Sequence, residues 1–99
     1  MPLNKQEIKA LMKRIKQMLK KEFAAIQTGS EVYVSKGWND NINVLVVSEA
    51  FEGMPAKARD NMVWPILEKL PETEMRHISL CLLLTPDEAE TPFATGIES

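Results

Sequence analysis

The segment INVLVV, residues 42–47, constrains the fold of this chain more than any other stretch. It is apolar on both of the faces that a β-strand presents, and such strands lie centrally in a sheet. Residues 31–35 before it are β-branched and aromatic, and KGWNDN at residues 36–41 supplies turn residues between the two. We therefore expect an antiparallel hairpin whose second strand lies in the middle of the sheet.

A long amphipathic helix is predicted over residues 5–23. Its apolar side chains recur every three or four residues, which is typical of one stripe on an α-helix, and lysines occupy the other faces. Asn4 is a suitable N-cap, Glu7 can complete a capping box, and Thr28-Gly29 follows as the exit. The stripe consists of Ile8, Leu11, Met12, Ile15, Met18, Leu19 and Phe23, and the lysines are Lys5, Lys9, Lys13, Lys16 and Lys20.

A second helix is predicted over residues 57–70, after a corner at Phe51 and Gly53. Gly53 permits a tight turn, Phe51 can fold inward, and Pro55 suits the start of a helix. Pro65 removes a hydrogen bond and crowds the preceding turn, so we expect a kink there or a break near Trp64. The apolar stripe consists of Ala58, Met62, Val63, Ile66, Leu67 and Leu70.

The third strand is predicted over residues 75–84, MRHISLCLLL. Thr85 and Pro86 then begin a short helix, which Thr91-Pro92 stops. The element order is α-β-β-α-β-α, and the two amphipathic helices need a sheet to cover. The expected fold is an α+β two-layer sandwich, in which helices cover one face of a three-stranded sheet. Ninety-nine residues make one domain, which we place at residues 1–91, with a flexible tail at 92–99.

Two stretches, VSEAFEGMPAKARDNMVWPIL and RHISLCLLLTPDE, resemble the BolA family of stress-related, iron-linked proteins. In that family a strand ends in Ser-x-x-Phe-x-Gly, and a helix begins with Arg and continues to an apolar–aromatic pair and a Leu. A later strand opens with His and is followed by Thr-Pro-x-Glu. The matching residues here are Ser48, Phe51, Gly53, Arg59, Val63, Trp64, Leu67, His77, Thr85, Pro86 and Glu88.

The resemblance implies a fold similar to type II K-homology domains, which agrees with the element order. The chain departs from the family pattern at three places. Arg59 is followed by Asp60 and Asn61 where the family helix usually opens Arg-His-Arg, and Pro65 is unexpected in that helix. The hairpin loop, which often carries a His or Cys in the family, carries neither here.

The sequence gives no sign of catalysis. His77 and Cys81 are the single residues of their kinds, and in a regular strand they stand about 13 Å apart on the face shared by Ser79 and Leu83. That separation excludes one shared metal ion or a nucleophile–base contact. Spaced carboxylate pairs and Walker or dinucleotide phosphate loops are also missing. We therefore expect a non-enzymatic protein that holds no cofactor by itself.

His77 has two interpretations. A lone His at the start of a strand is usually a packing or surface residue. The resemblance implies instead that it is an iron ligand, because family members pair with monothiol glutaredoxins and can supply this His to a shared [2Fe–2S] cluster. Histidine ligation of such clusters is established chemistry. Asp40 in the hairpin loop is a poor substitute for the missing second ligand.

Charge leaves a second class of function open, a nucleic-acid-binding regulator of the BolA or K-homology type. Residues 1–22 hold seven Lys/Arg and two Glu, whereas residues 23–99 hold five Lys/Arg and twelve Asp/Glu. A Gly-x-x-Gly loop is absent, so we expect weak nucleic-acid binding at most. Either partner, glutaredoxin or nucleic acid, is expected to use Lys57, Arg59 and Arg76.

The remaining expectations concern where and in what form the protein exists. No apolar run approaches the length needed to span a bilayer, so we expect no membrane association. A single cysteine fits a reducing compartment, which predicts a cytoplasmic protein. We expect a monomer or weak dimer.

Overall fold

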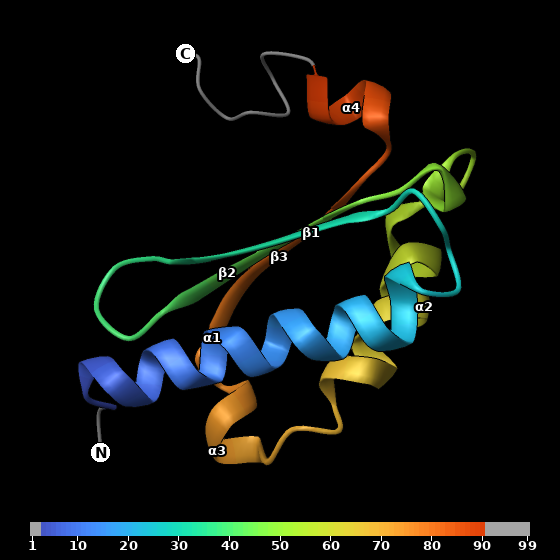
Figure 1. The fold of residues 1–99 in the computed structure, drawn as a ribbon. Helices are drawn as coiled ribbons and strands as arrows, with labels where there is room; N and C mark the ends of the chain where they lie inside the picture. The colour runs from blue at the N-terminus through green and yellow to red at the C-terminus, as the bar shows by residue number, and fades with distance from the viewer. Residues whose placement is uncertain (1–2, 91–99) are drawn as a thin grey trace.

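The computed structural model describes residues 3–90 and has two layers, a three-stranded sheet and the helices at residues 5–19 and 56–67, which cover one of its faces (Figure 1). After the second strand the chain makes a short 3₁₀ turn, Glu49–Phe51. The helices and strands are α1 (Lys5–Leu19), the π-helical turn η1 (Lys20–Ala24), β1 (Glu31–Lys36), β2 (Ile42–Val47), α2 (Ala56–Leu67), α3 (Glu72–Met75), β3 (Ile78–Leu84) and α4 (Pro86–Glu90). This architecture confirms the predicted α+β class.

The sheet has the strand order β1-β2-β3. β1 pairs antiparallel with β2, from Glu31 opposite Val47 to Lys36 opposite Ile42, so the predicted hairpin is confirmed. β3 returns on the other side of β2 and runs parallel to it, after the crossover through α2 and α3. The segment INVLVV therefore is the central strand, and β1 and β3 are the two edges of the sheet.

The core lies between the sheet and the helices α1 and α2 (Figure 1). Every second residue of β2 is fully buried against the helices, as a period of two requires. The apolar stripe of α1 is buried opposite it, which accounts for the three- and four-residue spacing in the sequence. The core residues are Leu11, Ile15, Leu19, Phe23, Val32, Ile42, Val44, Val46, Phe51, Val63, Leu67, Leu70 and Leu83.

The first helix begins as its sequence predicts. The side chain of Asn4 accepts a hydrogen bond from the backbone N–H of Glu7, and the Glu7 carboxylate accepts one from the backbone N–H of Asn4. This capping box satisfies two of the N–H groups that a helix leaves unpaired at its start. The C-terminal end is less regular, because the last turn widens into the π-helical η1, which keeps Phe23 buried.

The second helix is not broken near Trp64, which was one of the two predicted outcomes of Pro65. α2 continues without a break past Trp64 and Pro65 and ends at Leu67, three residues before the predicted end. Pro65 lies near the end of the helix, and it removes only the one hydrogen bond that its own backbone N–H would have donated. Burial of Val63 and Leu67 holds the last turn in place. Residues 68–70 form a turn in which Leu70 remains buried.

The third strand begins later than predicted. Residues 72–75 form the short helix α3, and β3 starts at Ile78, so His77 lies just before the strand. A bulge follows at once, because Ile42 pairs with Ile78 whereas Asn43 pairs with Leu80. The extra residue, Ser79, shifts the alternation of faces. The predicted common face of His77, Ser79, Cys81 and Leu83 is therefore wrong: Ser79 is exposed, while Leu83 is buried with the core.

The corner between β2 and α2 is built as the sequence indicates. Ser48 is buried, and its hydroxyl accepts a hydrogen bond from the backbone N–H of Ala50, which caps the 3₁₀ turn. The ring of Phe51 is fully buried and stacks on Phe23 with the centroids 5.4 Å apart. Gly53 has φ +76°, a backbone conformation that side chains disfavour. The corner thus joins the hairpin to both helices.

No helix among residues 3–90 is long and apolar enough to cross a bilayer. α4 begins at Pro86, as predicted. The predicted end of that helix at Thr91-Pro92 and the predicted tail at 92–99 lie outside the described residues.

Gly53 allows a direct test of the corner. A Cβ atom at this position would meet no atom within 4 Å, so the cost of Gly53→Ala is conformational only. We expect a loss of about 1 kcal/mol in the free energy of unfolding, measured by urea denaturation. Gly53→Asn is the control, and it should lose less because Asn tolerates positive φ. Equal stability of wild type and Gly53→Ala would contradict the assigned backbone conformation.

Candidate functional site

His77 is fixed by its backbone at the junction between α3 and β3. Its N–H donates to the carbonyl of Glu74 at 3.1 Å, and its own carbonyl accepts from the N–H of Ile42 at 2.8 Å. The side chain is half-buried, with Nδ1 3.2 Å from the backbone carbonyl oxygen of Asp40. The start of β3 and the hairpin loop, residues 37–41, are therefore held together at the imidazole.

The contact with Asp40 determines which ring nitrogen of a neutral His77 can bind a ligand. A carbonyl oxygen only accepts, so Nδ1 carries the proton and donates it. The lone pair is then on Nε2. Metal-binding histidines commonly have this arrangement, in which one ring nitrogen is held by a carbonyl and the other faces the metal. The structure thus orients the one imidazole of the chain so that its lone pair on Nε2 can bind a metal.

The hairpin loop beside His77 is ordered by its own hydrogen bonds. The N–H of Gly37 donates to the carbonyl of Asn41 at 2.8 Å, and the N–H of Asn41 donates to the carbonyl of Trp38 at 3.0 Å. Asn39 has φ +57°. The side chain of Trp38 is left 81% exposed, which is costly for an indole unless a partner covers it. Sequence reasoning treated this loop only as a turn, although an aromatic residue among turn residues was a signal.

The residues near His77 do not complete a metal site. Within residues 3–90, no group of three or more His, Cys, Asp or Glu side chains is placed to hold an ion. Cys81 is half-buried, and burial, with a smaller contribution from the Asp60 carboxylate, raises the pKa of its thiol to about 12. A thiolate ligand at this position is therefore disfavoured. The chain can offer one imidazole to a metal centre whose other ligands come from elsewhere.

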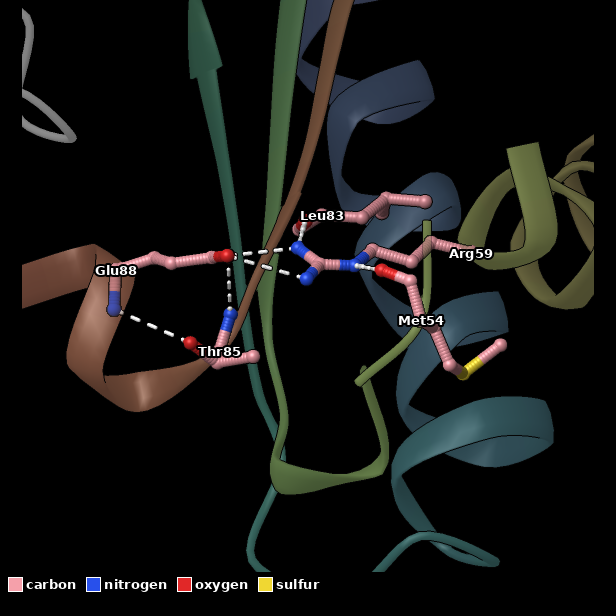
Figure 2. A network of polar contacts seen from close by, with 5 residues as sticks. All are labelled: Met54, Arg59, Leu83, Thr85 and Glu88. Atoms are coloured by element: carbon pink, nitrogen blue, oxygen red, sulfur yellow. Dashed lines mark hydrogen bonds and ion pairs between the residues drawn. The ribbon is translucent and has the colours of Figure 1, made fainter. Parts of the chain in front are cut away.

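Arg59 is at the centre of a separate polar network (Figure 2). Nε donates to the carbonyl of Met54 at 2.9 Å, and Nη1 donates to the carbonyl of Leu83 at 2.8 Å. Both terminal nitrogens also bind the carboxylate of Glu88, at 2.6 and 3.1 Å. The same carboxylate accepts a hydrogen bond from the backbone N–H of Thr85. In return, the Thr85 hydroxyl accepts one from the backbone N–H of Glu88. One guanidinium thus joins the corner before α2, the edge strand β3 and α4.

The family motif residues around Arg59 therefore have structural roles. The guanidinium carbon lies 5.8 Å from the centroid of Phe51, and the Arg59 side chain is only 12% exposed. Thr85 and Glu88 form a capping box for α4. Little of the Arg59 side chain is left for a partner or a nucleic acid.

The predicted surface residues fall in two places. Lys57 is exposed at the start of α2, close in sequence to Arg59, whose guanidinium reaches Leu83 near the end of β3. Arg76 is exposed next to His77, before the start of the same strand. A seven-residue strand is about 20 Å long, so the structure does not bring Lys57 and Arg59 to His77. Of Lys57, Arg59 and Arg76, only Arg76 lies next to His77.

The Arg59–Glu88 pair predicts how stability depends on pH. The hydrogen bonds from Arg59, followed by that from the Thr85 N–H, lower the pKa of Glu88 from 4.5 to about 2. A lowered pKa means that the carboxylate stabilises the fold above pH 4.5 and that this contribution is lost as the pH falls toward 2. Glu88→Gln should therefore be less stable than wild type at pH 7 and equally stable near pH 2, in urea denaturation at both values. A difference that does not change with pH would contradict this assignment.

Comparisons with known proteins agree with this fold. No protein-family model matches the chain, and no match was found among curated proteins. Among solved structures, the chain is similar to BolA1 from Arabidopsis thaliana, with 26% sequence identity and a TM-score of 0.60. The match covers 83% of this chain and 96% of that chain. The motifs from Ser48 to Glu88 and the arrangement of helices and strands thus lead to the same conclusion, that the chain has a BolA-like fold.

Proposed function

We propose that this protein is a non-enzymatic adaptor that binds a monothiol glutaredoxin and takes part in iron–sulfur or redox regulation in the cytoplasm. The observation that carries the proposal is the contact of 3.2 Å between Nδ1 of His77 and the carbonyl of Asp40. In the neutral ring, it leaves the lone pair of the only imidazole of the chain on Nε2, the nitrogen that would bind a metal. The BolA-like fold supplies the reason to connect this imidazole with a cluster carried by a partner.

The ligand chemistry requires that the partner provide most of the site. A [2Fe–2S] cluster has four protein or thiol ligands, and imidazole can replace thiolate at one iron. His77 supplies one such ligand, while the described residues offer no second one, since Cys81 is held as a thiol by burial. The cluster would therefore be shared, with its remaining ligands from the glutaredoxin side. It should also be more labile than a cluster with two ligands from the BolA-like protein.

Trp38 supplies a second element of the proposed interface. It belongs to the same hairpin loop as Asp40, and its side chain is 81% exposed. Exposed Trp residues commonly become anchors of protein–protein interfaces, because one side chain buries a large apolar area. Arg76, exposed beside His77, adds a positive charge to this surface. We define the glutaredoxin site as His77, Trp38 and Arg76.

The hydrogen bonds of the site favour binding over catalysis. Within residues 3–90, no Ser, Thr or Cys side chain is hydrogen-bonded to the His77 ring, whose only such contact is the Asp40 carbonyl. Activation of a nucleophile needs such a contact. The high pKa of Cys81 also makes its thiol a poor nucleophile.

Variants at His77 and Trp38 separate ligation from affinity. We expect His77→Ala to change the visible absorption and circular dichroism of the complex with a cluster-loaded monothiol glutaredoxin, because a thiol or water must replace the imidazole. Trp38→Ala should weaken binding by roughly tenfold or more but leave the spectrum of the saturated complex unchanged. Isothermal titration and spectroscopy measure the two effects.

The control is Lys57→Ala, an exposed residue away from this site. It should change neither the spectrum nor the affinity. If wild type, His77→Ala and Trp38→Ala gave the same spectrum and affinity, the proposed site would be wrong. If His77→Ala binds the cluster-free glutaredoxin with the same affinity as wild type does, the variant is folded.

A further inference from the structure

One face of α1, continued by the first residue of η1, carries a row of positive charge that the proposed function does not use. Five exposed lysines follow one another at intervals of three or four residues, which places them on one side of the helix. They span 16 residues, or about 22 Å of helix. We call this the lysine row, and it consists of Lys5, Lys9, Lys13, Lys16 and Lys20.

The lysine row has no carboxylate partner within residues 3–90. The ion pairs of α1 and η1 lie on the other flank, where Arg14 pairs with Glu74 at 2.5 Å and Glu22 pairs with Lys69. These two pairs connect the first helix to α3 and to the end of α2. On the flank that borders β1, none of these five lysines forms an ion pair with a described residue, although the whole chain has a net charge of −2.

Two separate hollows lie between the ends of the lysine row and β1, and we call the surface that they delimit the groove. One hollow of about 520 Å³ lies at the C-terminal end of the lysine row, where Lys16 and Lys20 face Val32 and Tyr33. A second hollow of about 500 Å³ lies at the other end, where Lys5 and Ile8 face Lys36 and the hairpin loop. Both ends of the lysine row thus border a hollow whose opposite wall comes from β1 or its loop.

The wall formed by β1 is an unpaired sheet edge. β1 is bonded to β2 on one side only. In the described chain, no hydrogen bond connects the backbone of β1 to α1 or to any element other than β2. An edge strand presents a row of backbone N–H and C=O groups, and an extended peptide satisfies them by pairing as a further strand.

We propose that this groove binds an extended acidic peptide segment of a partner protein, added as a fourth strand beside β1. The backbone of the peptide would pair with the β1 edge, and its carboxylates would contact the lysine row. Six residues of β1 measure about 20 Å, which matches the length of the lysine row and a peptide of about six or seven residues. This surface ends at the hairpin loop and does not include His77, so the proposal does not rest on the proposed function.

A peptide fits this groove better than a nucleic acid does. Phosphates would contact the lysines, but a nucleic acid has no backbone amide ladder to satisfy the β1 edge. The groove also contains the carboxylates of Glu31 and Asp40 at its two ends. Glu31 accepts a hydrogen bond from Tyr33 and Asp40 accepts one from the Leu3 N–H. These charges repel a continuous polyanion more than a short peptide that lies between them.

The test uses a capped seven-residue peptide that alternates Glu and Val, titrated at low ionic strength and followed by NMR. We expect chemical-shift changes in β1 and the lysine row but none in β3. Amide hydrogen exchange in β1 should slow in the complex, because N–H groups of the edge become bonded. The same peptide with Lys in place of Glu should not bind.

Two variants and two ligands decide between the alternatives. Lys13→Glu should weaken binding roughly fivefold, whereas Lys21→Glu, an equal charge change at an exposed residue outside the lysine row, should have little effect. A fully N-methylated peptide should bind much more weakly. Equal effects of the two variants, equal binding of the N-methylated peptide, or tighter binding of a single-stranded oligonucleotide of the same charge would each overturn the proposal.

Discussion

The guanidinium of Arg59 is the interaction on which the arrangement of the second half of the chain depends. It binds two backbone carbonyls and one carboxylate that belong to three different segments (Figure 2). The pair with Glu88 is bidentate, which fixes direction as well as distance. Because Leu83 lies on an edge strand, its carbonyl would otherwise need water or another chain. Arg59 therefore protects that end of β3 while it positions α4.

The Arg59 network also connects the polar and apolar parts of the fold. The guanidinium lies over Phe51, and Phe51 stacks on Phe23 from the end of the first helix. Phe51 can reach this position because Gly53, with its positive φ, turns the chain sharply after it. The Phe-x-Gly corner and the Arg are thus parts of one structural unit. This explains why a motif shared with the BolA family can be strong evidence for the fold and weak evidence for the site.

Sequence reasoning predicted the elements whose signals are local. The apolar periodicity and the Asn4–Glu7 capping box defined α1, and the turn residues after β1 defined the hairpin. The predicted alternative of a helix break near Trp64 was wrong, and so was the start of β3, because both depend on tertiary contacts. Burial of Leu67 continues α2 past the proline, and the α3 turn uses residues whose alternation resembled a strand. The bulge at Ser79 has no signal in the sequence at all.

The candidate site could be predicted only in part, for the same reason. The resemblance identified His77, but the contact that orients its ring joins residues 37 positions apart in the chain. Arg59 was expected on a partner surface, since nothing in the local sequence indicates that Glu88, 29 residues later, would bind it. Trp38 was not selected because its exposure depends on the path of the loop rather than on its neighbours in the sequence.

The hairpin loop connects the two proposed binding surfaces physically. The backbone carbonyl of Asp40 holds the ring of His77, while its carboxylate accepts the N–H of Leu3 just before α1. The groove between α1 and β1 therefore ends at the loop that carries Trp38. A partner that contacts His77 and also carries an acidic extended segment could bind both surfaces at once. The second contact would then be intramolecular, so two individually weak contacts would give a much tighter complex.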